Sequence, residues 1–245
     1  MNNSPILLFD SGIGGLSVLK EMTYALPHER YLYLGDNNNA PYGNKSTDEL
    51  TFLTYKNCDI IKKYKPKAVV LACNTLSVDF LDFVKEKTGV KTFGVFPPVS
   101  KALREGKSSI LLATERTCSK YKGEGGLYLL PLTDLAREIE KNAFNLSAID
   151  LNKQLCRKDS GISAIKGYFD TVILGCTHYN FLKTEISNHF CPRKVLSGGT
   201  FAVKNVKKYL EKNELLGNYR RFSVSFIGDT AEFNKKFYYS VVKKM

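Results

Sequence analysis

The sequence lacks several features that would place the protein in a common class. No Cys-x-x-Cys pair occurs among its six cysteines, which argues against a structural zinc site. A disulfide framework is not expected in a chain of 245 residues without a secretory signal, so we expect reduced thiols. There is no run of about 18 apolar residues, and the start at Met1 has neither the charged nor the apolar region of a signal peptide. These absences predict a cytoplasmic protein without a membrane span.

Two common nucleotide-binding loops are also missing. Gly12 and Gly14 follow the first apolar run, but Ser17 stands where Gly-x-Gly-x-x-Gly needs its third glycine, and no Gly-Lys-Ser/Thr ending of a P-loop follows. The glycines still permit a tight turn, with backbone N–H groups at a helix N-terminus free to hold a carboxylate. Asp10, beside this turn, either caps the helix or takes part in chemistry. We expect no cofactor and no metal.

Basic residues outnumber acidic ones. The chain has 36 Lys and Arg against 24 Asp and Glu, a net charge of +12, and from Phe201 onward ten basic residues stand against four acidic ones. Such a balance permits contact with nucleic acid or attraction of anionic substrates. Lysine-rich solvated helix faces are common, so dedicated nucleic-acid binding is not our expectation. The expected partners are a small-molecule substrate and a second copy of the chain in a homodimer, with no membrane.

Cys73 and Cys176 carry the most informative pattern. Each follows a short apolar run, 68–72 and 171–175, and each is followed at once by small hydroxyl or amide groups. Such a run is typical of a buried parallel strand whose C-terminal end opens onto a ligand crevice. A free cysteine is usually only a small buried hydrophobe, but the recurrence favours two thiols that face one cleft. His178, two residues after Cys176, is a group that helps a thiol to titrate.

Strands alternate with helices throughout the chain, which predicts an α/β protein of two doubly wound parallel-sheet domains. A capping box at 46–49 begins one helix, another begins at about Ser77, and Leu135, Ile139 and Phe144 form a buried stripe in a mostly helical segment at 132–166. Strands are predicted at 6–9, 31–34, 68–72, 92–96, 109–113, 171–175, near 195 and at 223–227. Because Pro97 and Pro98 cannot continue a ladder, we place one domain at 1–96 and 206–245 and the other at 97–205.

Two facing thiols suit one reaction in particular. Moving a proton from one face of the carbon next to a carboxylate to the other face needs one base on each side of that carbon. A thiol fits this task because its unperturbed pKa, about 8.5, comes near neutral with modest tuning. Asp10 is the candidate to orient or deprotonate the first thiol, and His178 to serve the second.

The residues resemble the cofactor-independent glutamate racemases of the aspartate/glutamate racemase superfamily. The resemblance covers essentially the whole chain and is specific, because four motifs occur in the family's order and spacing. These are Asp10-Ser11-Gly12-x-Gly14-Gly15, Pro41-Tyr42-Gly43-x-Lys45, Cys73-Asn74-Thr75-x-Ser77 and Gly175-Cys176-Thr177-His178-Tyr179.

The resemblance implies two α/β domains related by pseudo-twofold symmetry, with glutamate held in the cleft between them. It also implies that Cys73 and Cys176 are the two acid/bases, assisted by Asp10 and His178, and that the product D-glutamate supplies peptidoglycan. The implied substrate-binding residues are Ser11, Pro41, Tyr42, Gly43, Asn74, Thr75 and Thr177.

The chain departs from the family pattern in places. Leu76 stands where the family usually has Ala, Asn180 where Pro commonly follows the Tyr, and Val99 where a Pro-Gly pair is frequent after Pro97-Pro98. The Thr-rich turn at Thr114 and Thr117 is followed by a shortened segment, 118–121, so the resemblance does not extend to the usual contacts of this region.

The sequence leaves the role of one acidic residue, Glu138, undecided. Glu138 aligns loosely with a pocket glutamate of some family members, and the alternative is an exposed helix residue. None of the departures removes a catalytic group.

Three other functions remain open from the sequence. The first is a racemase of the same superfamily that acts on aspartate or a related amino acid. Aspartate racemases usually have Thr-Glu after the second cysteine, so Thr177-His178 favours glutamate over aspartate. A basic nucleic-acid-binding protein would leave the repeated cysteine pattern unexplained. A thiol redox protein would need the Cα atoms of Cys73 and Cys176 within about 7 Å of each other.

Overall fold

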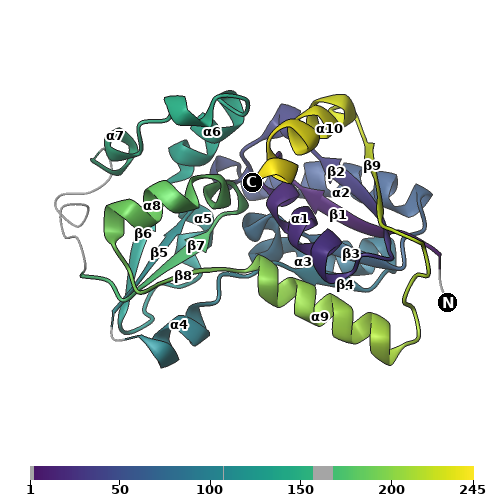
Figure 1. The fold of residues 1–245 in the computed structure, drawn as a ribbon, viewed down its shortest axis with the longest axis horizontal. Helices are drawn as coiled ribbons and strands as arrows, with labels where there is room; N and C mark the ends of the chain where they lie inside the picture. Colours follow the sequence, from purple (N-terminus) through teal and green to yellow (C-terminus); the bar gives the residue numbers. More distant parts are fainter. Residues whose placement is uncertain (1–2, 107, 157–167) are drawn as a thin grey trace.

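Two parallel sheets form the framework of the computed structural model, which describes residues 3–106, 108–156 and 168–245 (Figure 1). The first sheet has the strand order β4-β3-β1-β2-β9 and the second has the order β6-β5-β7-β8. The strands of the first sheet are β1 (Ile6–Asp10), β2 (Arg30–Gly35), β3 (Ala68–Leu71), β4 (Thr92–Gly94) and β9 (Ser223–Ile227). Those of the second are β5 (Ser109–Ala113), β6 (Leu127–Pro131), β7 (Thr171–Gly175) and β8 (Lys194–Ser197).

The second sheet repeats the topology of the first. When β5 is matched with β1, β6 with β2, β7 with β3 and β8 with β4, the strand orders are the same, and β9 is an extra strand beside β2. All pairings are parallel. The predicted fold class, two parallel-sheet α/β domains, is confirmed, and the repeat makes the ends of β3 and β7 equivalent positions. The domain limits at 96/97 and 205/206 stay a prediction.

Helices cover the sheets, and each sheet keeps its own set on its own side of the molecule (Figure 1). Beside the first sheet lie α1 (Gly15–Ala25), α2 (Thr47–Lys63), α3 (Asn74–Thr88), α9 (Gly199–Lys212) and α10 (Ala231–Ser240). Beside the second lie α4 (Val99–Glu105), α5 (Glu115–Ser119), α6 (Thr133–Lys141), α7 (Leu151–Cys156) and α8 (Lys183–Phe190). Short 3-10 segments include η1 (Asn37–Asn39), η2 (Tyr42–Asn44), η3 (Leu146–Ala148), η5 (Thr177–Leu182) and η6 (Val242–Lys244).

Local sequence explains the best-predicted helix boundary. The Ser46 hydroxyl accepts from Glu49 N–H while the Glu49 carboxylate accepts from Ser46 N–H, which is the predicted capping box at the start of α2. Helix α3 ends at Gly89, which takes a left-handed conformation with φ of 68°, where a side chain would be strained.

Other local predictions needed correction. Helix α3 begins at Asn74 rather than near Ser77, with Cys73 as its N-cap residue. Strand β6 and helix α4 were not predicted. Strand β6 is a partly exposed strand at the edge of the second sheet, and its apolar run ends at Pro131, a residue that only edge positions of a sheet tolerate.

The predicted helical segment at 132–166 is confirmed where it is described. It contains α6, η3 and α7, and residues 157–166 lie outside the described residues. Leu135 and Ile139 are buried as predicted, but Phe144 is wrong as a core residue because it is 47% exposed. Phe144 lies beyond the end of α6 and packs edge-on against Phe233 and Phe237 of α10.

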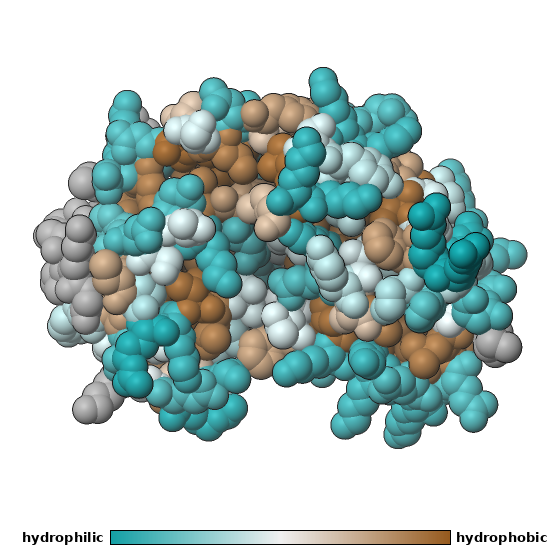
Figure 2. Space-filling model, in the orientation of Figure 1, coloured by the Kyte–Doolittle hydropathy of each residue, from teal (hydrophilic) through white to brown (hydrophobic). Residues whose placement is uncertain are grey.

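Part of the surplus positive charge lies on the solvated surface of α9. Lysines 204, 207, 208 and 212 of α9 are exposed, and hydrophilic side chains project along this edge of the molecule in Figure 2.

No helix in the described part of the chain is long and apolar enough to cross a membrane. Within the same residues, no three His, Cys, Asp or Glu side chains are grouped so as to hold a metal ion.

Candidate active site

The two thiols occupy equivalent places in the two sheets. Cys73 follows β3 and Cys176 follows β7, and both are buried free cysteines. They line one enclosed cavity of about 10 Å³ between the halves of the molecule. Every residue predicted for the site except Asp10 lines it, and two that were not predicted, Thr114 and Ala136, also line it. The full set is Ser11, Pro41, Tyr42, Gly43, Cys73, Asn74, Thr75, Thr114, Ala136, Cys176, Thr177 and His178.

Cys73 sits at a tightly held turn. Ser77 fixes this turn, since its hydroxyl donates to the carbonyls of Leu71 and Cys73 and accepts from Val95 N–H, all at 2.9 Å. Burial, together with the nearby charge of Asp10, raises the pKa of the Cys73 thiol to about 12, although hydrogen bonds with Leu76 N–H and the Ser11 side chain lower it. At neutral pH this sulfur is therefore a neutral thiol, able to give a proton.

Cys176 has a different neighbourhood. Its Sγ lies 3.6 Å from Nδ1 of His178, and Nε2 of His178 lies 2.6 Å from Oε1 of Glu140. Glu140 is only 12% exposed and also accepts from Ile13 N–H at 2.7 Å and from the Asn37 amide at 3.2 Å. A continuous chain of polar contacts thus runs from Glu140 through His178 to the Cys176 sulfur.

The protonation of His178 follows from these contacts. Burial alone lowers the pKa of His178, but hydrogen bonds with Cys176 and Glu140, together with charge interactions with both, raise it well above its ordinary value. A protonated imidazole donates from both ring nitrogens, which suits an acceptor on each side. The geometry therefore places a positive charge beside Cys176, whereas Cys73 faces the carboxylate of Asp10.

Asp10 links the two halves instead of capping a helix. Helix α1 has Gly14 as its N-cap residue and no side-chain cap, so the capping alternative is wrong. The Asp10 carboxylate accepts from Gly12 N–H at 2.9 Å and from the Thr177 hydroxyl at 3.2 Å. The backbone N–H groups of Gly12 and Ile13, predicted to be free for a ligand carboxylate, are thus held by Asp10 and Glu140.

Replacing Asp10 by asparagine should stabilise the fold in a pH-dependent way. Burial raises the pKa of Asp10 from 3.8 to about 6, although the positive charge of His178 and two hydrogen bonds lower it. A change of this size corresponds to about 3 kcal/mol. The cost of burying the ionised carboxylate is full above pH about 6 and vanishes once the group is protonated in both states, below pH about 4.

The measurement for Asp10→Asn is urea unfolding between pH about 4 and 8. The variant should exceed the parent protein in free energy of unfolding at pH 7.5, and the difference should shrink as the pH falls. Asp82→Asn, an exposed carboxylate on α3, controls for the change itself. A constant difference across this range would show that Asp10 does not carry the buried charge.

The acidic residue of the site is Glu140, not Glu138. Glu138 is only partly buried on α6, and its side chain makes no contact with the cavity. Ala136, which lines the cavity, and Glu140 are four residues apart and share one face of α6. Helical spacing from Ala136 would have pointed to Glu140, but the sequence does not reveal which face of α6 meets His178.

The Thr-rich turn also contributes to the site despite the shortened segment after it. The Thr114 hydroxyl lies 3.1 Å from that of Thr75, which joins the two halves, and donates to Thr117 at 3.2 Å. Gly43 packs against Thr114 so closely that an added Cβ would lie 2.4 Å from the Thr114 side chain. This close approach explains the glycine after Tyr42.

An ion-pair cluster joins the two halves at one edge of the site. Arg116 on α5 pairs with Asp79 on α3 at 2.9 Å and donates to the Lys45 carbonyl at 3.1 Å, and Lys120 pairs with Asp79 at 2.6 Å.

The thiol cavity is small: its volume of about 10 Å³ is about the space of one water molecule. The structure is therefore a closed form, and a larger ligand requires the halves to separate.

Comparisons with known proteins agree on one family. A scan against protein-family models finds no match. The glutamate racemase of Clostridium novyi is 36% identical over 225 residues, which cover 86% of this chain and 85% of the relative. That of Buchnera aphidicola is 34% identical and covers 87% of this chain and 88% of the relative.

Solved structures give the same result. The Thermus thermophilus glutamate racemase in complex with beta-chloro-D-alanine has a TM-score of 0.77 at 27% identity, covering 97% of this chain and 92% of that one. The Escherichia coli glutamate racemase, in complex with L-glutamate and the activator UDP-MurNAc-ala, has a TM-score of 0.75 at 26% identity, covering 98% and 94%. Sequence identity across most of both chains, joined to the shared fold, places this chain in the glutamate racemase family.

Proposed function

We propose that the protein interconverts L- and D-glutamate, with Cys73 and Cys176 as the two acid/base groups. The observation that carries the proposal is that thiols at equivalent strand ends line a single enclosed cavity. Membership of the glutamate racemase family supports glutamate as the substrate. The aspartate, nucleic-acid and redox alternatives gain no support from the relatives.

In the proposed reaction one thiolate takes the proton from the α-carbon. The electron pair of the broken C–H bond stays on the substrate, delocalised toward its carboxylate, and the opposite thiol then gives its proton to the other face. The substrate is neither oxidised nor reduced, and the two sulfurs exchange protonation states. A neutral Cys73 and an imidazolium beside Cys176 are suited to proton removal by Cys176 and proton delivery by Cys73.

We assign Asp10 to the Cys73 side of the cavity and His178, supported by Glu140, to the Cys176 side. The remaining lining residues serve as the substrate anchors. The Asn74 amide N–H donates to the Val95 carbonyl at 2.8 Å, which leaves its Oδ1 to accept from the substrate ammonium. Ser11, Thr75 and Thr177 supply hydroxyls for the carboxylates, and the segment from Pro41 to Gly43 forms the wall beside them.

We further assign the product to peptidoglycan synthesis, the protein to the cytoplasm and the working form to a homodimer. Exposed aromatic residues on α2, Phe52 and Tyr55, offer apolar area for a contact between copies. These three assignments rest on the family resemblance and on this surface.

Circular dichroism of each enantiomer incubated with purified protein tests the proposed function. L-glutamate and D-glutamate should both converge on the racemic mixture without added cofactor, whereas L-aspartate should keep its signal. If L-aspartate alone lost its signal, aspartate would take the place of glutamate as the assigned substrate. If no amino acid changed its signal, the proposed reaction would be overturned.

A further inference from the structure

A cavity of about 660 Å³ lies directly outside the thiol cavity. Its walls come from η2 and α3 of the first half, which is built on the first sheet, and from α5 and α6 of the second half. It reaches the protein surface, since Ser119 and Lys120 in its wall are exposed. Gly43 lines this outer cavity and the thiol cavity alike, so the two cavities are neighbours.

The contacts that separate the two cavities cross between the halves. Thr114 of the second half packs closely against Gly43 of the first, and its hydroxyl lies 3.1 Å from that of Thr75 at the start of α3. A thiol cavity of about 10 Å³ cannot hold glutamate in this form. Movement of Thr114 away from Gly43 and Thr75 would join the two cavities into one path from the surface to the thiols.

An ion-pair cluster holds these contacts in place. Asp79 lies one helical turn after Thr75 on the same face of α3. One oxygen of its carboxylate pairs with Arg116 at 2.9 Å and the other with Lys120 at 2.6 Å, both from the second half. The Asp79 side chain is only 9% exposed, so these two cations replace most of its contact with water. We call Asp79, Arg116 and Lys120 the latch.

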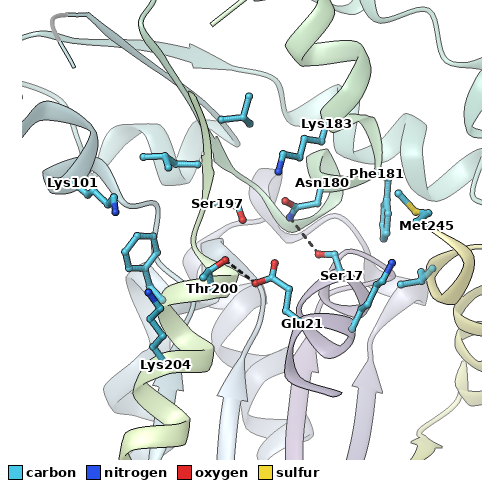
Figure 3. Close-up of a pocket in the computed structure, with 15 residues that line it drawn as sticks. Ser17, Glu21, Lys101, Asn180, Phe181, Lys183, Ser197, Thr200, Lys204 and Met245 are labelled. Carbon is cyan, nitrogen blue, oxygen red and sulfur yellow. Dashed lines mark hydrogen bonds between the residues drawn. The ribbon is translucent and has the colours of Figure 1, made fainter. Parts of the chain in front are cut away.

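Electrostatic attraction between the halves is concentrated at the latch. Among the ion pairs between described residues, only the two at Asp79 join the halves. Figure 3 shows another edge of the interface, a cavity where Lys204 of the first half lies across from Lys183 of the second. Lys20 and Lys101 also line it, and like charges from both halves do not hold the halves together.

The latch cations are chemically suited to bind a carboxylate other than that of Asp79. A guanidinium binds a carboxylate through a planar pair of N–H donors, and an ammonium adds a point charge. Two further carboxylates line the outer cavity, but Asp134 pairs with Arg137 at 3.0 Å and Glu115 is exposed. The carboxylate that a ligand has to displace is therefore that of Asp79.

We propose that glutamate enters the thiol site through the outer cavity, and that Arg116 and Lys120 bind a carboxylate of the incoming amino acid in place of Asp79. The exchange breaks the ion pairs that hold the halves together, so Thr114 withdraws from Thr75 and the substrate passes to the thiols. Glutamate as the ligand rests on the proposed function, whereas the latch rests on the contacts across the interface.

Alkylation of a buried thiol tests the latch without any racemase activity. Cys176 is enclosed while the halves are together, so its rate of reaction with iodoacetamide, read by mass spectrometry, follows the fraction of open molecules. Asp79→Asn should raise this rate about three- to tenfold, because two ion pairs across the interface are lost. The matched control is Asp59→Asn, which breaks an ion pair with Lys62 inside α2.

A second thiol in the same samples separates opening from unfolding. Cys58 is buried in the core of the first half, and its rate of alkylation should stay unchanged in Asp79→Asn. An unchanged rate at Cys176 overturns the latch. An equal rise at Cys58, or an equal rise at Cys176 in Asp59→Asn, also overturns it, because the effect is then not specific to the interface.

The rate at which glutamate enters tests the role of the two cations. Exchange broadening of the D-glutamate NMR signals gives the association rate constant, measured in a Cys73→Ala background so that racemisation does not interfere. Arg116→Gln combined with Lys120→Gln breaks the same ion pairs as Asp79→Asn but also removes the carboxylate-binding groups. Association should therefore be at least about tenfold slower in the double variant than in Asp79→Asn.

The control for the lost charge is Lys62→Gln with Lys63→Gln, at exposed positions of α2. Equal association rate constants in Asp79→Asn and in the Arg116 and Lys120 double variant overturn the capture by cations, and so does equal slowing in the control. If no protein shows exchange broadening, glutamate is overturned as the ligand together with the proposed function. The alkylation result decides the latch separately.

Discussion

Replacing Cys73 or Cys176 by alanine should abolish the interconversion of L- and D-glutamate. Each change removes the only acid/base group on one face of the α-carbon, and such groups typically contribute about 10²- to 10⁴-fold to the rate. The loss of kcat/KM must be the same in both directions, because the equilibrium constant between enantiomers is one. The single thiol that remains still reaches one face of the substrate.

Incubation of each enantiomer in D₂O, followed by NMR, gives the sharpest measurement. Racemisation should vanish in both variants, while deuterium exchange into one enantiomer without inversion is the residual reaction open to a single base. Cys58→Ala is the matched control, since Cys58 is equally buried but packs in the core of the first half on α2. A cysteine variant that keeps turnover close to the parent protein in both directions would rule out the two-thiol mechanism.

Replacing Glu140 by glutamine should lower kcat/KM about 10- to 100-fold, by analogy with carboxylates that orient metal-bound histidines, whose removal costs this much activity. Glu140 holds Nε2 of His178 at 2.6 Å, and its charge raises the pKa of His178. Without that charge the pKa of His178 falls, so the imidazolium beside Cys176 is lost at a lower pH than in the parent protein. The alkaline limb of the pH–rate profile should shift to lower pH.

NMR titration of the His178 ring, read beside the pH–rate profile, measures this effect directly. Glu138→Gln is the matched control, because it makes the same chemical change on the same helix without contact with His178. A purely structural role for Glu140 would lower activity without moving either pH curve. An equal loss of kcat/KM in Glu138→Gln would show that Glu140 does not have the role assigned to it beside His178.

The sequence by itself determined what depends on neighbours along the chain. The capping box at Ser46, the apolar runs and the two cysteine turns are short patterns whose meaning comes from local backbone preferences and from burial on both faces of a parallel sheet. Motif order then linked Cys73 and Cys176 to one reaction. Strand β6 also has an apolar run, but its proline at residue 131 is unfavourable within a sheet and is tolerated only because β6 lies at the edge.

Only the tertiary structure decided which distant residues meet. It selected Glu140 over Glu138 because one face of α6 turns toward His178, and it placed Phe144 outside the core, in edge-on contact with α10. It also gathered four lysines from four elements around one cavity and closed the thiol site with the Asp79–Arg116 pair. Such contacts depend on how two sheets are placed against each other, and sequence spacing does not encode that placement locally.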